Sequence, residues 1–308
     1  MARRALGPAT LAVVRAVDSL PPASWLVACS GGADSLALAW AAHHVASRRA
    51  TPVAALVVDH GLQPGSDAVA AAVLDVLASF GLSGDAVAVT VPDAGAGPEA
   101  SAREARYAAL ERASGDRTVL LGHTRDDQAE TVLLGLARGS GPRSLAGMPA
   151  ARGPFRRPLL DLTRETTASA CSELGLAPWQ DPMNADRRYA RVRVREVVLP
   201  MLEEQLGPGV RDALARSATL LSEVLGRAGA DTDPDADAAD CAWLAGLAPG
   251  HRRRALHQWL RASGARDLSS SHVHAVEGLV TSWRGQKGID VPGGRVLRRD
   301  GRLVLDLK

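Results

Sequence analysis

The chain has 308 residues, of which 46% are hydrophobic and 23% are charged, and its formal net charge is +2. These values are typical of a globular protein large enough for two domains, and they exclude a disordered chain. No run of about 18 apolar residues occurs, so no membrane span is expected. The three cysteines lie far apart and form no CxxC pair, which favours reduced thiols and a cytoplasmic location.

Short apolar runs alternate with amphipathic segments along the first part of the chain. The expected strands are 25–29, 52–59, 86–91 and 118–122, and the expected helices are 11–20, 34–47, 66–80 and a segment that starts near residue 98. The connections have room only for βαβ crossovers, so we expect an α/β fold with a doubly wound parallel sheet. In such a sheet, ligands bind beyond the carboxyl ends of the strands.

The first expected strand ends in a loop that is typical of a phosphate site. Glycines let the backbone approach an oxyanion, and the first N–H groups of the following helix point at it. Asp34 would repel a phosphate unless a cation lay between them, which suggests Mg²⁺. The candidate nucleotide-binding residues are Ser30, Gly31, Gly32, Ala33, Asp34 and Ser35.

This loop lacks the features of two common nucleotide motifs. No Gly-x4-Gly-Lys-Ser/Thr occurs in the chain, and no Gly-x-Gly-x-x-Gly occurs at this turn. The motif instead resembles the pyrophosphate loop of the PP-loop ATPases, whose members adenylate a substrate and release pyrophosphate. A plain helix cap at Asp34 is the alternative, and the full Ser-Gly-Gly-x-Asp-Ser pattern disfavours it.

Polar residues also follow the other strands, at Asp59 and at 123–130, and should meet the loop at one sheet edge. Asp127 and Glu130 are three residues apart and therefore share one helix face. They would bind Mg²⁺ or a substrate ammonium, or else they complement the helix dipole. The neighbouring phosphate loop favours the first interpretation.

The chain changes character after residue 138. Residues 138–195 hold eleven arginines and five acidic residues, and Arg187, Arg191 and Arg195 would form one helical stripe. Such a stripe suits an RNA backbone, whereas a solvated arginine-rich face is the alternative. A long helix at 200–227 and an acidic linker at 228–240 should precede a small C-terminal α+β domain.

The order of motifs resembles that of the tRNA(Ile)-lysidine synthases. The matching segments are 30–35, 59–62, 99–103, 106–107, 122–131, 138–141, 145–148, 157–160, 179–184 and the basic run that ends at 195–200. The resemblance implies that ATP adenylates the wobble cytidine of a CAU-anticodon tRNA(Ile) and that the ε-amine of L-lysine then displaces AMP. It also implies a compact family member, a possible homodimer, with a catalytic domain at 1–200, a helix and linker at 201–240, and a tRNA-contacting domain at 241–308.

The resemblance further implies a role for each site residue. The loop residues would hold the pyrophosphate, Asp34 would carry Mg²⁺, and His123 would lie near the adenylate. Arg103, Asp127 and Glu130 would surround the adenylated base and the lysine. Two other functions stay open: a related tRNA 2-thiocytidine synthase, which commonly needs CxxC cysteines, and a non-enzymatic nucleotide- or RNA-binding protein.

Overall fold

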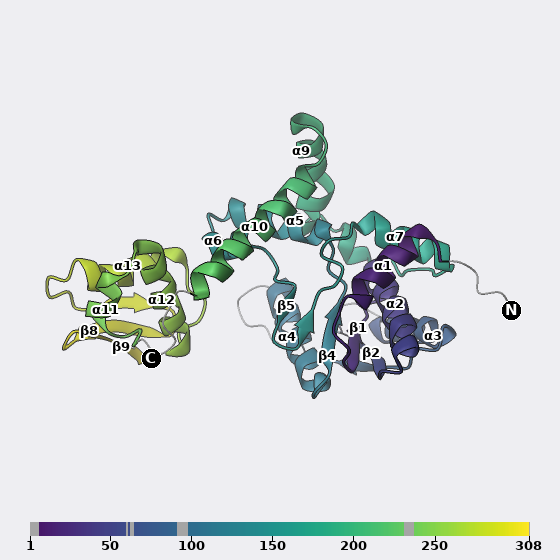
Figure 1. Cartoon of the computed structure of the whole chain (residues 1–308), viewed down its shortest axis with the longest axis horizontal. Helices are drawn as coiled ribbons and strands as arrows, with labels where there is room; N and C mark the ends of the chain where they lie inside the picture. Colours follow the sequence, from purple (N-terminus) through teal and green to yellow (C-terminus); the bar gives the residue numbers. More distant parts are fainter. Residues whose placement is uncertain (1–5, 60, 62–64, 91–97, 231–236, 308) are drawn as a thin grey trace. The chain divides into compact units, whose positions relative to one another are not determined.

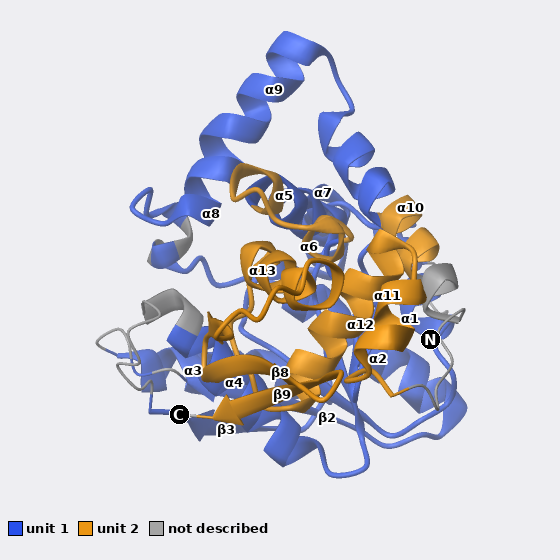
Figure 2. Ribbon diagram, turned by 90° about the vertical axis from the view of Figure 1, so that its left-hand side faces the viewer, with its two compact units in different colours: residues 1–134, 147–218 blue, residues 135–146, 219–308 orange. Residues whose placement is uncertain are grey.

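The computed structural model describes residues 6–59, 61, 65–90, 98–230 and 237–307. The chain divides into two compact units, shown in blue and orange in Figure 2. Unit 1 comprises residues 1–134 and 147–218, and unit 2 comprises residues 135–146 and 219–308. The functional boundaries expected near residues 200 and 240 stay a prediction.

Unit 1 is built on a mostly parallel sheet, which confirms the expected fold class (Figure 1). Its strands are β1 (Trp25–Ala28), β2 (Val53–Asp59), β3 (Gly84–Ala88), β4 (Thr118–Leu121), β5 (Ala151–Arg152) and β6 (Phe155–Arg156). Their order is β3-β2-β1-β4-β6-β5, and β5 alone runs antiparallel to its neighbour among the described strands of this sheet. The short β5–β6 hairpin was not expected, because two-residue strands carry no sequence period.

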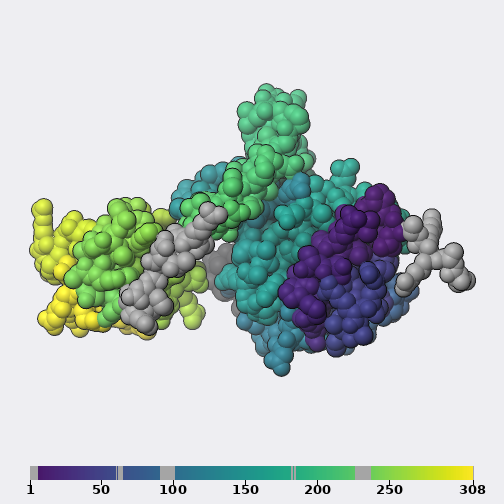
Figure 3. Space-filling model, in the orientation of Figure 1, coloured from purple at the N-terminus to yellow at the C-terminus, as the bar shows by residue number. Residues whose placement is uncertain are grey.

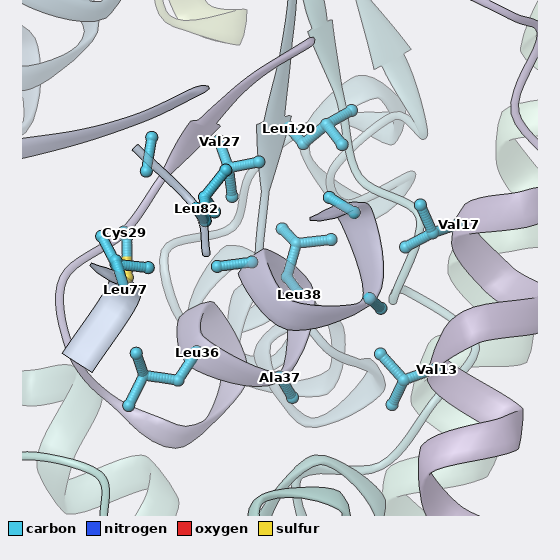
Figure 4. Close-up of a cluster of buried hydrophobic side chains, with 14 of the residues drawn as sticks. Val13, Val17, Val27, Cys29, Leu36, Ala37, Leu38, Leu77, Leu82 and Leu120 are labelled. Atoms are coloured by element: carbon cyan, nitrogen blue, oxygen red, sulfur yellow. The ribbon is translucent and has the colours of Figure 1, made fainter. Parts of the chain in front are cut away.

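Helices cover both faces of this sheet. Figure 4 shows Val13 and Val17 of α1 (Pro8–Asp18) packing beside Leu38 of α2 (Ala33–Arg49) in one core. The same core includes residues of α3 (Ser66–Ser79) and α7 (Arg164–Leu174). The opposite face of the sheet packs against α4 (Pro98–Ser114) through Leu110.

β1 is buried on both faces because it lies at the centre of the sheet. Trp25 and Val27 belong to the core beside α2, whereas Leu26 and Ala28 belong to the core beside α4. Val27 pairs with Ala55 of β2 and with a residue of β4. The uninterrupted apolar run that predicted this strand therefore reflects burial on two sides.

A carboxylate from α7 caps the N-terminus of α1 and so links these two helices of unit 1. Glu173 accepts hydrogen bonds from the backbone N–H groups of Ala9 and Thr10, at 3.1 and 2.8 Å, and from the Thr10 hydroxyl at 2.6 Å. These N–H groups have no partner within the helix, so Glu173 supplies the cap that Gly7 cannot. Figure 3 shows α1, in purple, lying along the outside of this unit.

The single helix expected at 200–227 is wrong, because the chain breaks there. α9 (Leu199–Leu206) and α10 (Val210–Ala230) are separate helices. Gly207 and Gly209 adopt φ values of +93° and +98°, which other residues rarely reach. Glu203 then caps α10 by accepting hydrogen bonds from three successive backbone N–H groups of 209–211, at 2.6, 3.2 and 2.9 Å.

Unit 2 has the α+β composition expected of the C-terminal part. It contains α6 (Pro142–Leu145), α11 (Cys241–Gly246), α12 (Pro249–Ala262) and α13 (Ser270–Thr281), with the antiparallel strands β7 (Ile289–Val291), β8 (Gly294–Arg299) and β9 (Arg302–Leu307). Asp300 and Gly301 have positive φ values, as a tight hairpin turn requires. Of the acidic linker expected at 228–240, residues 231–236 lie outside the described residues, and residues 228–230 form the end of α10. Across the described ranges, no helix combines the length and apolar character needed to cross a membrane.

Candidate active site

The candidate site lies where the order of strands reverses. β1 is flanked by β2 and β4, and the chain moves from β1 out to β3 before it returns to β4. The carboxyl ends of β1 and β4 therefore face one crevice. A Cβ on Gly122, just after β4, would lie 3.0 Å from the backbone carbon and oxygen of Asp34. Only glycine allows this approach without a shift, and it brings His123 beside the phosphate loop.

The loop 30–35 is held open by its own side chains. Gly31 adopts φ +83°, and a Cβ there would lie 2.5 Å from Val73. The Ser35 hydroxyl donates to the Gly32 carbonyl at 2.9 Å and accepts from the Ser30 N–H at 3.2 Å. α2 begins at Ala33, so its unpaired N–H groups face the crevice. The structure brings the residues that the sequence indicated into one loop at the N-terminus of α2, and their role as an anion cradle stays a prediction.

A cavity of about 290 Å³ lies beside this loop. Its apolar wall comes from β2 and α3, and its polar wall includes Ser30, Asp59 and Arg106. Trp179 also lines it and donates its backbone N–H to the Gly31 carbonyl at 3.0 Å. The space suits a flat, partly apolar group such as a nucleobase. The sequence did not indicate Trp179 as a cavity residue.

Asp34 is the carboxylate inside the cradle. Its Oδ1 accepts a short hydrogen bond from the Thr167 hydroxyl, and its Oδ2 lies 3.7 Å from Arg164 Nε. Burial raises the pKa of Asp34 to about 6, because the hydrogen bond and the guanidinium only partly offset desolvation. Arg164 therefore only partly neutralises the charge of this carboxylate.

This donor set fits a magnesium ion that is shared with a ligand. Mg²⁺ is commonly held by one or two carboxylates together with substrate phosphates and water. Within the described part of the chain, no three His, Cys, Asp or Glu side chains gather as metal ligands. Asp34 would thus be the protein's contribution, and phosphate oxygens would complete the site.

Asp127 and Glu130 lie in what we term the arginine–carboxylate network, with Arg164, Arg191 and Arg195. Glu130 has no exposed surface, and its two oxygens lie 2.7 Å from Arg195 Nε and Arg191 Nε. Arg164 Nη2 lies 3.1 Å from Asp127 and 3.2 Å from Glu130. Burial alone would raise the pKa of Glu130, but the hydrogen bond from Arg195 and the nearby arginines lower it overall. Both carboxylates are ionised and neutralised.

The expected outward stripe of arginines is wrong. Arg191 and Arg195 turn inward to Glu130 from the short helix α8 (Ala190–Arg193) and the π-helical turn Val194–Val198. Arg187 lies before that helix and pairs with Glu196 at 3.2 Å. A buried carboxylate needs cationic partners, and this requirement outweighs the solvation of the arginines. The four-residue spacing of these arginines is visible in the sequence, but the sequence does not show that Glu130 is their partner.

Asp127 caps a helix N-terminus, which agrees with one of the two interpretations, whereas binding of Mg²⁺ or of an ammonium stays a prediction. Its Oδ2 caps α5 (Arg125–Ala137), accepting from the Thr124 N–H at 2.8 Å and the Thr124 hydroxyl at 3.0 Å. Its Oδ1 faces Arg164 and Arg191, each at 3.1 Å. Burial by itself would raise the pKa of Asp127. The two arginines and the hydrogen bond from Thr124 together have the larger effect, so the pKa is lowered overall.

Three arginines that have no carboxylate partner among the described residues act on His123. Its Nδ1 is buried without a hydrogen-bond partner in the described structure. Burial lowers the pKa of His123 well below its usual range; attraction to Asp127 opposes this shift, and repulsion from Arg106, Arg157 and Arg103 adds to it. Arg103 lies 5.0 Å from the centre of the Tyr107 ring. His123 is therefore a neutral imidazole beside the loop.

Several residues of this site were not sequence candidates. Arg106 and Arg157 were seen only as parts of matching motifs, and Arg164 and Thr167 carried no signal. Arg157 Nη2 donates to the Tyr107 hydroxyl at 3.1 Å, and Arg164 approaches Asp34 and the network together. Their importance depends on neighbours that are distant in the sequence.

Unit 2 carries a separate basic cluster, formed by Arg143, Arg254, His257 and Arg261. Arg143 Nη1 lies 2.9 Å from His257 Nδ1. Burial, together with Arg143 and Arg261, lowers the pKa of His257. The neighbouring Arg252 and Arg253 are instead neutralised by a carboxylate of α13, at 2.9 and 2.7 Å. The cluster presents positive charge that has no acidic partner among the described residues of this unit.

Comparison with known families gives two matches along the chain. Residues 10–202 match the model of a PP-loop domain, and residues 240–304 match that of a TilS substrate binding domain. A tRNA(Ile)-lysidine synthase of Salinispora arenicola is 53% identical over 96% of this chain and 94% of its own length. The synthase of Thermobifida fusca is 50% identical over 96% of this chain and 95% of its own length.

Solved structures agree on the fold. The U34-tRNA thiolase of Methanococcus maripaludis, solved with its [4Fe-4S] cluster, is similar with a TM-score of 0.58. The match spans 70% of this chain and 78% of the thiolase chain, and the two sequences are 19% identical over it. A likeness at this identity supports the architecture and not the chemistry.

Proposed function

Since the chain belongs to the tRNA(Ile)-lysidine synthase family, we propose that it joins free L-lysine to C2 of the wobble cytidine of a CAU-anticodon tRNA(Ile), using ATP. One observation carries the proposal. The phosphate loop, the base-sized cavity and the arginine–carboxylate network converge on one crevice of unit 1. The residues match a reaction that must hold a triphosphate, a base and an amine together.

In the first step, O2 of the cytosine attacks the α-phosphorus of ATP. The new bond joins this oxygen to phosphorus, and the bond to the β-phosphate oxygen breaks, so pyrophosphate leaves. Ser30, Gly31, Gly32 and Ser35 hold the departing phosphates through backbone N–H groups and hydroxyls. When Mg²⁺ is bound, it neutralises the charge that develops on the phosphate oxygens, and Asp34 is the residue that holds it.

In the second step, the lysine ε-amine attacks C2 of the adenylated base. The bond from C2 to the activated oxygen breaks, and AMP leaves with that oxygen. Only the neutral amine attacks, and the arginines near His123 disfavour an ammonium there. Asp127 and Glu130 act here by fixing Arg164, Arg191 and Arg195. Arg103, which lies over the Tyr107 ring, is a candidate contact for the base.

The tRNA would contact unit 2 as well. The match of residues 240–304 to a TilS substrate binding domain supports this role, and the basic cluster supplies the charge that an RNA backbone attracts. The expected homodimer stays a prediction.

Thiolation is the alternative that the fold neighbour raises. A sulfur-transfer enzyme commonly needs paired or cluster-binding cysteines. Here Cys29, Cys171 and Cys241 are buried and free, and within the described residues they join no metal-ligand group. These cysteines therefore favour lysine transfer over sulfur transfer.

The deciding experiment separates the two steps. The full chain is incubated with ATP, Mg²⁺ and a CAU-anticodon tRNA(Ile) transcript, first without lysine and then with labelled lysine. We expect RNA-dependent pyrophosphate release in the first reaction and labelled tRNA in the second. A transcript with uridine at the wobble position is the matched control. Absence of label from the cognate tRNA would refute the proposed function.

A further inference from the structure

Arg106 lies in the wall of the cavity, and neither the phosphate loop nor the arginine–carboxylate network accounts for its charge. It lies two turns into α4 and lines the cavity together with Cys29, Ser30 and Gly32. Arg106 is half-buried, and desolvation of its guanidinium lowers its pKa; the interaction with Tyr107 opposes this shift, and repulsion from Arg103 adds to it. Within the described structure, no carboxylate lies within ion-pair distance of Arg106.

The contrast with the arginine–carboxylate network is informative. There, Arg164, Arg191 and Arg195 are matched by buried carboxylates at 2.7 to 3.9 Å. A buried charge without a partner is costly, and proteins normally neutralise it. Since this chain neutralises one group of arginines completely, an unmatched arginine in the same crevice indicates a partner that comes from outside the protein.

The surroundings of Arg106 define the charge of that partner. The side chains that act on Arg106 electrostatically add positive charge or none: Arg103 is cationic, and His123 is held neutral. Arg157 is also buried, and its Nε has no hydrogen-bond partner in the described chain. The carboxylates Asp59 and Asp181 line the same cavity, but neither lies within ion-pair distance of Arg106 in the described structure. An anion that enters the cavity would therefore meet an uncompensated guanidinium as well as the phosphate loop.

We propose that Arg106 binds a phosphate group of the nucleotide in the cavity that it lines together with Ser30 and Gly32 of the loop 30–35. This inference rests on the proposed ATP chemistry. The cavity that Arg106 lines also contains Ser30 and Asp59, which places it with the nucleotide rather than with the RNA backbone. Either of two groups of the nucleotide could pair with Arg106: the α-phosphate, which stays with AMP, or the pyrophosphate, which leaves.

The test compares Arg106→Gln, which removes the charge, with Arg106→Lys, which keeps it. Arg112→Gln is the matched control, since Arg112 lies on the same helix with an exposed side chain. Binding of ATP, AMP, pyrophosphate and adenosine is measured by calorimetry, with Mg²⁺ present for the phosphorylated ligands. Thermal unfolding without ligand and binding of tRNA are measured for every variant.

We expect Arg106→Gln to weaken ATP binding by about tenfold to a hundredfold, as the loss of a charge-assisted contact does. Adenosine binding and the unfolding temperature without ligand should not change, and Arg106→Lys should recover part of the affinity. Weaker AMP binding assigns the contact to the α-phosphate. Weaker pyrophosphate binding with unchanged AMP assigns it to the leaving group.

Three results overturn the inference. Equal losses for ATP and adenosine would mean that Arg106 only shapes the cavity. Unchanged ATP binding with weaker tRNA binding would place the contact on the RNA, and unchanged binding of every ligand would leave Arg106 without a phosphate. A wild-type chain that binds no ATP would instead overturn the proposed function, and this inference with it.

Discussion

Asp34→Asn should stabilise the ligand-free protein while abolishing its activity. The carboxylate is buried in the phosphate cradle, and its pKa is raised from 3.8 to about 6. A shift of about 2 pKa units corresponds to about 3 kcal/mol of destabilisation once the group is fully ionised. Asparagine keeps the oxygen that accepts from Thr167 but carries no charge. We therefore expect a gain of about 2 to 3 kcal/mol near pH 8.

The pH dependence gives this prediction its sign. Between about pH 4 and pH 6 the folded state binds the Asp34 proton and the unfolded state does not, so the stability of the wild type falls as pH rises. Above about pH 6 the penalty is complete. The advantage of Asp34→Asn should therefore be full near pH 8 and fall below about 1 kcal/mol near pH 4. Other titrating groups are common to both proteins and cancel in the difference.

Calorimetric unfolding of the full chain checks the prediction. For a domain of about 200 residues, 2 to 3 kcal/mol corresponds to roughly 4 to 10 °C. Asp18→Asn is the control, because Asp18 forms an exposed ion pair with Arg49 that should be worth less than about 1 kcal/mol. ATP with Mg²⁺ should stabilise the wild type more than Asp34→Asn. A ligand-free Asp34→Asn protein that unfolds below the wild type near pH 8 would refute the reasoning.

Three further predictions follow from the site. Glu130→Gln leaves buried arginines undercompensated and should lower the free energy of unfolding by about 3 to 5 kcal/mol in urea titrations; a loss under about 1 kcal/mol would contradict the network. Gly122→Ala pushes the first turn of α2 and should weaken ATP binding at least about tenfold in calorimetry, whereas unchanged affinity would show that the loop yields freely. Arg143→Gln and Arg261→Gln should each reduce the salt dependence of tRNA binding by about 0.7 in log–log slope, measured by filter binding, and an unchanged slope would place the RNA elsewhere.

The parallel sheet could be predicted because its strands are buried on both faces. Trp25, Val27 and their neighbours form an uninterrupted apolar run, and this pattern ends at a glycine-rich turn. The turn predicted the anion cradle because glycine and hydroxyl residues have few other uses at that position. For Gly31, the positive φ and the nearness of Val73 explain why glycine occupies this position.

The rest of the site could not be predicted because it depends on partners distant in the sequence. The spacing of Arg191 and Arg195 is the same for a stripe that faces RNA and for one that encloses Glu130. Which of these forms depends on the position of a carboxylate some sixty residues earlier. The break between α9 and α10 had a local signal, since Gly207 and Gly209 flank a proline, and the apolar periodicity hid it.

The distribution of partners among the arginines distinguishes structural charges from charges that serve a ligand. A carboxylate at 2.7 Å accounts for Arg191 without reference to any substrate, because the pair is nearly neutral and its carboxylate is fully buried. Arg106 has no such account, and neither does the raised pKa of Asp34. Arg106 carries an unbalanced positive charge and Asp34 an unbalanced negative charge in the same crevice. Each of them lowers the stability of the ligand-free protein. Nucleotide phosphates would neutralise Arg106, and a cation bound to those phosphates would neutralise Asp34. One ligand would thus relieve both costs, which links substrate binding to the stability of unit 1.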